Sequence, residues 1–202
     1  MKNLLLILIL LTSVSAHGQA LDDFLRNMPD SIMPYFKKES MQLLLGFTGE
    51  DGDTLSSQSD DLGGKVWLSH KSERLVTIHT SSASEIQVAM IPNANDTLFC
   101  FIRTQYAPEA ESRVIIYNKV WEPQRSIELE KYANIQFPDT MPSAERNELL
   151  KMVEMKMYSA KILPEEPDML VIIQNLPVLS AEEKSRFKAC KMQTKLNIMQ
   201  FL

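Results

Sequence analysis

Five short segments rich in β-branched, aliphatic and aromatic residues follow one another between residues 65 and 118. The connections between them are short and rich in Ser, Asn, Asp and Gly, which favour turns. Connections of hairpin length join antiparallel neighbours, whereas parallel strands need a crossover of a dozen or more residues. The pattern therefore predicts an antiparallel β-meander. The predicted strands are residues 65–70, 75–80, 86–91, 98–104 and 113–118.

The side-chain pattern within these strands predicts how the sheet is buried. Ile86, Val88 and Met90 alternate with Glu85 and Gln87, so one face of that strand is expected to contact water.

The next predicted strand has a different character. Residues 98–102 are apolar on both faces, which predicts a central strand covered by a helix. The sequence Trp121-Glu122-Pro123 is expected to end the meander.

Helical patterns flank the predicted sheet. Leu21, Phe24, Leu25 and Met28 recur at helical spacing, and Pro29 is expected to end this N-terminal helix. A second helix is expected over residues 143–158.

The C-terminal region adds three more expected elements. Residues 159–163 and 169–175 predict a β-hairpin, and Ser180 begins a short helix with a capping box. Alternation over residues 190–198 predicts a final half-buried strand. The expected fold is therefore α+β: an antiparallel β-meander with helices packed on one face and a C-terminal β-hairpin, helix and strand.

Residues 1–18 have the layout of a secretory signal peptide. A basic start with Lys2 precedes an aliphatic run over residues 4–11 and a set of small residues. The run is shorter than the about 20 residues that span a bilayer. We expect cleavage before Gln19, with cleavage after Ala16 or Ala20 as alternatives. A single α+β domain over residues 19–202, periplasmic or secreted and without a transmembrane anchor, is then expected.

Charge restricts the expected partners. Loss of Lys2 with the signal peptide takes the formal charge from −5 to −6. Nucleic-acid binding requires clustered Lys and Arg, and a membrane-surface helix requires a basic face, so neither partner is expected.

The sequence predicts no catalytic, cofactor-binding or metal-ligating residue. His70 and His79 could meet across a hairpin and hold zinc with a carboxylate, but their spacing does not enforce ligation. Ser81, Ser82 and Ser84 lack the Gly-x-Ser-x-Gly context of a nucleophile elbow. No cofactor is expected.

The two cysteines, Cys100 and Cys190, leave pairing open, because disulfides persist in exported proteins. Both also fit apolar positions of predicted strands, which favours two free thiols.

Three segments carry a resemblance to a known family. They are residues 27–35 (NMPDSIMPY), residues 103–112 (RTQYAPEAES) with the following Ile116-Tyr117 and Trp121-Glu122-Pro123, and residues 179–184 (LSAEEK). Together they resemble a Bacteroidales family called domain of unknown function 3256, whose members are exported and uncharacterised. The resemblance implies an exported location and no catalytic residue.

Four tripeptides read Asp, then Ser or Thr, then an aliphatic residue or Met, and resemble the O-glycosylation motif of exported Bacteroidetes proteins. Asp-Ser and Asp-Thr also favour caps and turns for backbone hydrogen bonding alone. The candidate hydroxyl groups belong to Ser31, Thr54, Thr97 and Thr140.

These observations leave two classes of function open. The first is a non-enzymatic envelope protein that binds another envelope protein or a glycan. The alternative is a small periplasmic hydrolase with an unrecognised site near His70 and His79. The missing set of acid, base and nucleophile favours the first class.

Overall fold

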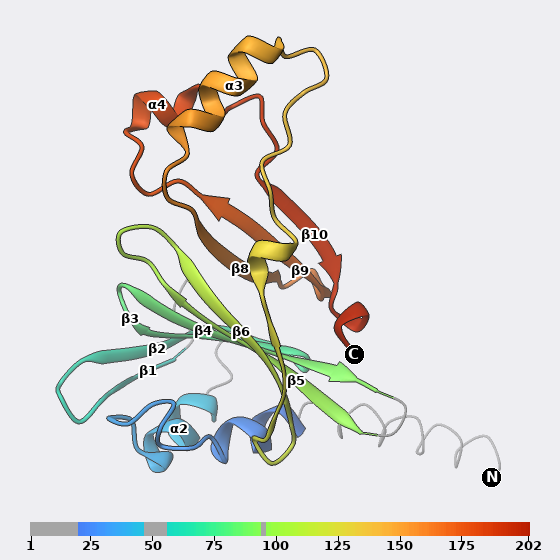
Figure 1. The fold of residues 1–202 in the computed structure, drawn as a ribbon. Helices are drawn as coiled ribbons and strands as arrows, with labels where there is room; N and C mark the ends of the chain where they lie inside the picture. The colour runs from blue at the N-terminus through green and yellow to red at the C-terminus, as the bar shows by residue number, and fades with distance from the viewer. Residues whose placement is uncertain (1–19, 47–55, 94–95) are drawn as a thin grey trace.

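A computed structural model of the protein describes residues 20–46, 56–93 and 96–202. Two β-sheets pack on each other, with one group of helices beneath the larger sheet and another beyond the smaller one (Figure 1). The predicted α+β class is thereby confirmed. The predicted signal peptide and Thr54 lie outside the described residues.

The larger sheet has seven antiparallel strands in chain order, so the predicted meander is confirmed. Each of the five predicted strands corresponds to an observed strand from β2 to β6. The strands are β1 (Ser56–Ser59), β2 (Lys65–Lys71), β3 (Leu75–Ser81), β4 (Ser84–Pro92), β5 (Thr97–Gln105), β6 (Glu111–Asn118) and β7 (Pro123–Ile127).

The two edge strands, β1 and β7, have no apolar alternation that would predict them. β1 reads SSQS, and four of the five residues of β7 are exposed. The expectation that residues 121–123 end the meander is wrong. Trp121 adopts a positive φ of 63° in a tight hairpin, and the Asn118 carbonyl accepts its N–H at 3.1 Å. Each of the two strands is held by backbone pairing with one neighbour, β2 for β1 and β6 for β7, and not by an apolar pattern of its own.

A three-stranded antiparallel sheet forms the second layer. Its strands lie in the order β10–β9–β8, so both the predicted C-terminal hairpin and the final strand are confirmed. The strands are β8 (Met157–Leu163), β9 (Glu166–Asn175) and β10 (Gln193–Asn197).

The second sheet covers the face of the meander that was expected to be wet. Gln87 lies on that face and is buried, and its amide group exchanges hydrogen bonds with the Ile162 backbone: Nε2 donates to the carbonyl at 3.2 Å and Oε1 accepts from the N–H at 2.9 Å. The polar alternation therefore marks a paired polar group between two sheets rather than a solvent-exposed face.

The first C-terminal helix is shorter than the sequence predicts, and the second is confirmed as a short helix. α3 covers Ser143–Met152, and the expected extension to residue 158 is wrong because Met157 and Tyr158 pair with β9 as the start of β8. α4 (Ala181–Ser185) has the predicted capping box: Ser180 N–H donates to the Glu183 carboxylate and Glu183 N–H to the Ser180 hydroxyl. Two 3₁₀ helices, η1 (Leu129–Lys131) and η2 (Ile198–Phe201), complete the described C-terminal half.

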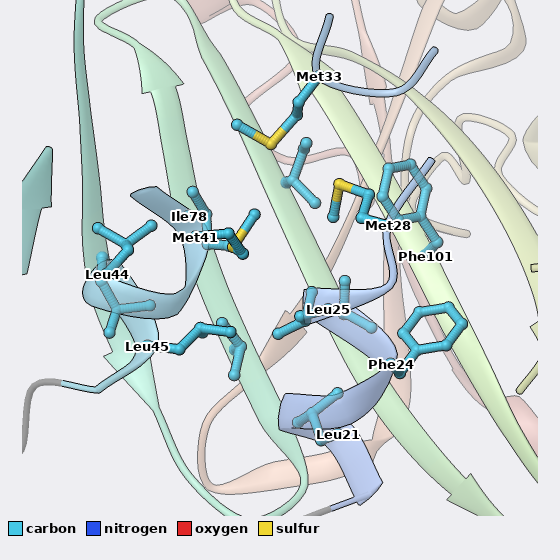
Figure 2. Packing of buried hydrophobic residues seen from close by; sticks show 14 of the residues in the cluster. Leu21, Phe24, Leu25, Met28, Met33, Met41, Leu44, Leu45, Ile78 and Phe101 are labelled. Carbon is cyan, nitrogen blue, oxygen red and sulfur yellow. The ribbon is translucent and has the colours of Figure 1, made fainter. Parts of the chain in front are cut away.

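The N-terminal helices cover the other face of the meander. Residues 20–26 are helical and α2 covers Lys38–Leu45. The predicted apolar stripe is confirmed, because its four residues are all buried. Figure 2 shows the stripe with α2 and with Ile78 and Phe101 of the sheet. This apolar cluster contains Leu21, Phe24, Leu25, Met28, Met41, Leu44 and Leu45.

An aromatic stack joins the first helix to the sheet. The Phe24 ring lies parallel to Phe99 on one side and Trp121 on the other, each with ring centroids 3.9 Å apart. Trp121 Nε1 also donates to the Phe24 carbonyl at 2.9 Å. These contacts hold Trp121 in the left-handed backbone region, which bulky residues rarely adopt.

The stack generates a stability prediction. Trp121→Phe removes the indole N–H and leaves the buried Phe24 carbonyl unpaired, so the free energy of unfolding in urea should fall by about 1–3 kcal/mol. Val120→Ala in the same turn changes a side chain that is 63% exposed and should leave stability nearly unchanged. Equal effects of the two substitutions would contradict the role of the indole.

Candidate functional site

The segment between the two N-terminal helices is held in place by backbone contacts. Ile32 N–H donates to the Pro29 carbonyl at 2.9 Å, and Phe36 N–H to the Met33 carbonyl at 3.1 Å. From the loop after β1, Asp61 N–H donates to the Tyr35 carbonyl at 2.8 Å. The segment therefore forms an ordered wall against one end of the meander.

A cavity of about 130 Å³, open to solvent, lies between this wall and the sheet. Apolar side chains make up much of its lining, and one basic group, Arg103, reaches it from β5. The lining residues are Ile32, Met33, Pro34, Tyr35, Phe36, Asp60, Val66, Thr80 and Arg103.

Arg103 continues the buried face of β5 after Phe99 and Phe101. One guanidinium nitrogen donates to the Ile32 carbonyl, which ties the wall to the sheet. The buried Nε–H has no hydrogen-bond partner among the residues that the structure describes. Burial lowers the pKa of Arg103, and the nearby Tyr117 acts in the opposite direction.

The charge of Arg103 is not matched by a nearby carboxylate. In antiparallel register Arg103 lies directly opposite Arg113 of β6, so two like charges share one face of the sheet. Within the described parts of the chain, neither guanidinium has a carboxylate oxygen within 4.0 Å. The cavity thus presents a positive group beside apolar walls, with the Asp60 carboxylate also in its lining.

Asp60 lines the same cavity but is engaged by its own loop. Its Oδ1 accepts from Leu62 N–H at 2.9 Å and from Gly64 N–H at 2.6 Å. A Cβ at Gly64 would lie 2.6 Å from Asp60 Oδ2, so a side chain at this position would displace the carboxylate from its place in the loop. Asp60 shapes the cavity rim and does not pair with Arg103.

The two histidines lie on the opposite face of the meander. His79 stacks on Trp67 with ring centroids 4.7 Å apart, and its Nε2 lies 3.5 Å from Glu85 Oε2. Tyr106 approaches the same carboxylate, and burial together with Glu85 raises the pKa of Tyr106 to about 12.

His70 is not part of this arrangement. In the register of β2 and β3 it lies opposite Thr77, and its buried Nε2 has no partner. Burial lowers the pKa of His70. The residues that the structure describes contain no group of three His, Cys, Asp or Glu side chains able to hold a metal ion.

The described glycosylation candidates occupy different environments. Ser31 and Thr140 are exposed in turns, whereas Thr97 is half-buried as the first residue of β5. None of the three lies in the lining of the Arg103 cavity.

Two of the family-like segments meet at the cavity, and a third is tied to them. Arg103 from residues 103–112 binds Ile32 from residues 27–35. Farther along the same segment, Glu109 forms an ion pair with Lys184 from residues 179–184. The segments that carry the resemblance are therefore joined in space by direct contacts.

Comparison with known protein families agrees with the resemblance that these segments carry. The family described as "Protein of unknown function (DUF3256)" matches residues 13–196, and the chain belongs to that family. No curated protein matches the chain.

One solved structure with the same fold comes from Porphyromonas gingivalis W83, in agreement with the Bacteroidales resemblance. It is described as a domain of an uncharacterized protein, is 21% identical, and superposes with a TM-score of 0.64. The match covers 88% of this chain and 91% of that one.

The sequence did not single out Arg103 as a binding residue. The position of Arg103 in the sequence could have indicated this role. Arg103 follows Phe99 and Phe101 on the same face of an otherwise apolar strand. An arginine at such a position is either paired or placed at a cavity, and Ile32, which accepts its hydrogen bond, lies 71 residues earlier in the chain.

The structure has both cysteines as free thiols, as the sequence favours. Cys100 is buried between the two sheets, and burial raises its pKa to about 12, whereas Cys190 is half-buried near Phe187.

We therefore expect unequal reactivity of the thiols. At pH 8 the folded protein should react with a maleimide at Cys190 well before Cys100, because reaction requires an accessible thiolate. In denaturant mass spectrometry should count two adducts, and Cys190→Ser should remove the fast one. No adduct in denaturant would instead indicate a disulfide.

Proposed function

We propose that this protein is an exported, non-enzymatic binding module that holds an anionic group of its ligand against Arg103. The half-buried guanidinium at the cavity, which has no carboxylate partner among the described residues, carries this proposal. Burial of a cation without a counterion is unfavourable, and a bound anion offsets that cost. Arginine suits the role because its planar fork binds carboxylates through two parallel hydrogen bonds.

Export is supported by the signal-like layout of residues 1–18 and by the family resemblance. None of the described helices has the length and apolar character that a membrane span requires. The partner that presents the ligand would accordingly be an envelope protein or a glycan.

The alternative, a small periplasmic hydrolase, has only the contact between His79 and Glu85 in its support. Such a dyad requires a nucleophile or an activated water held in hydrogen-bonding reach. In the described residues no hydroxyl or thiol is hydrogen-bonded to His70 or His79, so binding is the function that we propose.

A binding test follows from the absence of a carboxylate partner for Arg103 in the described residues. Acetate, sulfate and phosphate are titrated at constant ionic strength while thermal unfolding is recorded. An anion at 100 times its Kd adds about 2.7 kcal/mol of stability, which should raise Tm by about 5–10 °C in a chain of this size.

Arg103→Gln should abolish this rise, whereas Arg113→Gln, a matched charge change outside the cavity lining, should keep most of it. Arg103→Met should also abolish the rise, and it should lower the stability of the unliganded protein only moderately, because it loses the hydrogen bond to the Ile32 carbonyl but no ion pair. An undiminished rise in Arg103→Gln would refute the proposed site.

Intact mass of the protein from its native host tests export and modification together. Signal removal should leave an N-terminus within residues 17–21. O-glycosylation, which we propose for at least one candidate hydroxyl, should add hexose-type mass that disappears when Ser31, Thr54, Thr97 and Thr140 are changed to Ala. A main species with intact Met1 would contradict export, and an unmodified mass in the wild type would rule out glycan at these positions.

A further inference from the structure

The composition of the Arg103 cavity restricts the chemistry of its ligand. One side presents the guanidinium from β5, and the other sides present Ile32, Met33, Phe36 and Val66. A ligand that fills this space must therefore combine a negative group with an apolar part. The two parts must be adjacent, because the cavity is small.

Its volume sets the size of the apolar part. The volume of about 130 Å³ is close to that of an engineered protein cavity of about 150 Å³ that binds benzene. The cavity thus has room for roughly six non-hydrogen atoms, which include any part of the anionic group that enters it. The apolar part that fits is therefore a Val-, Leu- or Met-sized side chain.

The side chains of the lining offer few free hydrogen-bonding groups for the several hydroxyl groups of a sugar ring. Besides Arg103, the polar side chains are Asp60, Thr80 and the Tyr35 hydroxyl at the rim, where Tyr35 is 54% exposed. Asp60 Oδ1 already accepts two backbone N–H groups. A buried pyranose would leave several hydroxyl groups without partners, which is unfavourable.

The backbone of the wall adds little to this set. The Ile32 carbonyl accepts from Arg103, and the Tyr35 carbonyl accepts from Asp61. The Met33 carbonyl is occupied by Phe36 N–H. A single guanidinium therefore provides the main polar contact, and it matches one carboxylate better than a phosphate dianion.

We propose that the ligand group is a carboxylate attached directly to a short aliphatic group. This chemistry is presented by the C-terminal residue of a polypeptide and by free branched aliphatic acids. The inference rests on the proposed function, because it requires that the cavity binds an anion through Arg103.

Binding of matched probes to the full mature chain tests the inference by calorimetry and by thermal shift. The probes are 4-methylpentanoate, its amide, acetate, phosphate and glucuronate. Each buried methylene contributes about 0.8 kcal/mol, so 4-methylpentanoate should bind at least about tenfold more tightly than acetate. The amide, which lacks the charge, should not bind.

Three variants test which residues contact the ligand. Arg103→Gln should lose binding of 4-methylpentanoate, and Arg113→Gln should keep it. Val66→Thr, which replaces a wall methyl by a hydroxyl at nearly constant volume, should weaken 4-methylpentanoate more than acetate. An equal effect on the two ligands would show that the apolar wall does not contact the ligand and would overturn the inference.

The remaining outcomes separate this inference from the proposed function. If phosphate or acetate binds through Arg103 as tightly as 4-methylpentanoate, or glucuronate binds more tightly, the inference is overturned and the proposed function stands. If no anion binds through Arg103, both fail.

A peptide that ends in Leu shows whether the carboxylate belongs to a polypeptide C-terminus or to a free aliphatic acid. If the peptide with a free carboxylate binds and its C-terminal amide does not, the inference is supported with a polypeptide terminus as ligand. If the peptide does not bind but 4-methylpentanoate does, it is supported with a free acid as ligand.

Discussion

The parallel stack of Phe99, Phe24 and Trp121 is the contact on which the N-terminal half of the structure depends. It fixes the first helix on the meander, and the segment after that helix then forms the wall of the Arg103 cavity. The stack also explains the rare backbone conformation of Trp121, because the indole contacts Phe24 through both its ring and its N–H. A turn residue and a helix residue thereby determine each other's position.

Strand β5 connects this arrangement to the second sheet. Phe99 and Phe101 contact the N-terminal helices, whereas Cys100 and Ile102 contact the layer of β8 and β9. The apolar series on the helix side ends at Arg103. The cavity lies at this point because a guanidinium cannot be enclosed as an alkyl side chain can, and because the wall leaves space around it.

Much of the fold follows from local sequence. Alternating apolar residues and short turns specify strands β2 to β6, and the capping box specifies the start of α4. The edge strands β1 and β7 were not predicted, since they are polar and exist through pairing with a neighbour. The end of α3 differs from the sequence prediction for a related reason. Met157 and Tyr158 pair with β9 and therefore belong to a strand, and local helical propensity does not reveal this pairing.

By itself the sequence determined the fold class, the meander, the N-terminal apolar stripe and the family, because each depends on residues that are close in the chain. Only the tertiary structure decided which residues meet across long separations. It buried Gln87 under Ile162, separated His70 from the pair of His79 and Glu85, and placed Ile32 over Arg103. Such contacts depend on the docking of whole layers, and no local pattern of side chains encodes them.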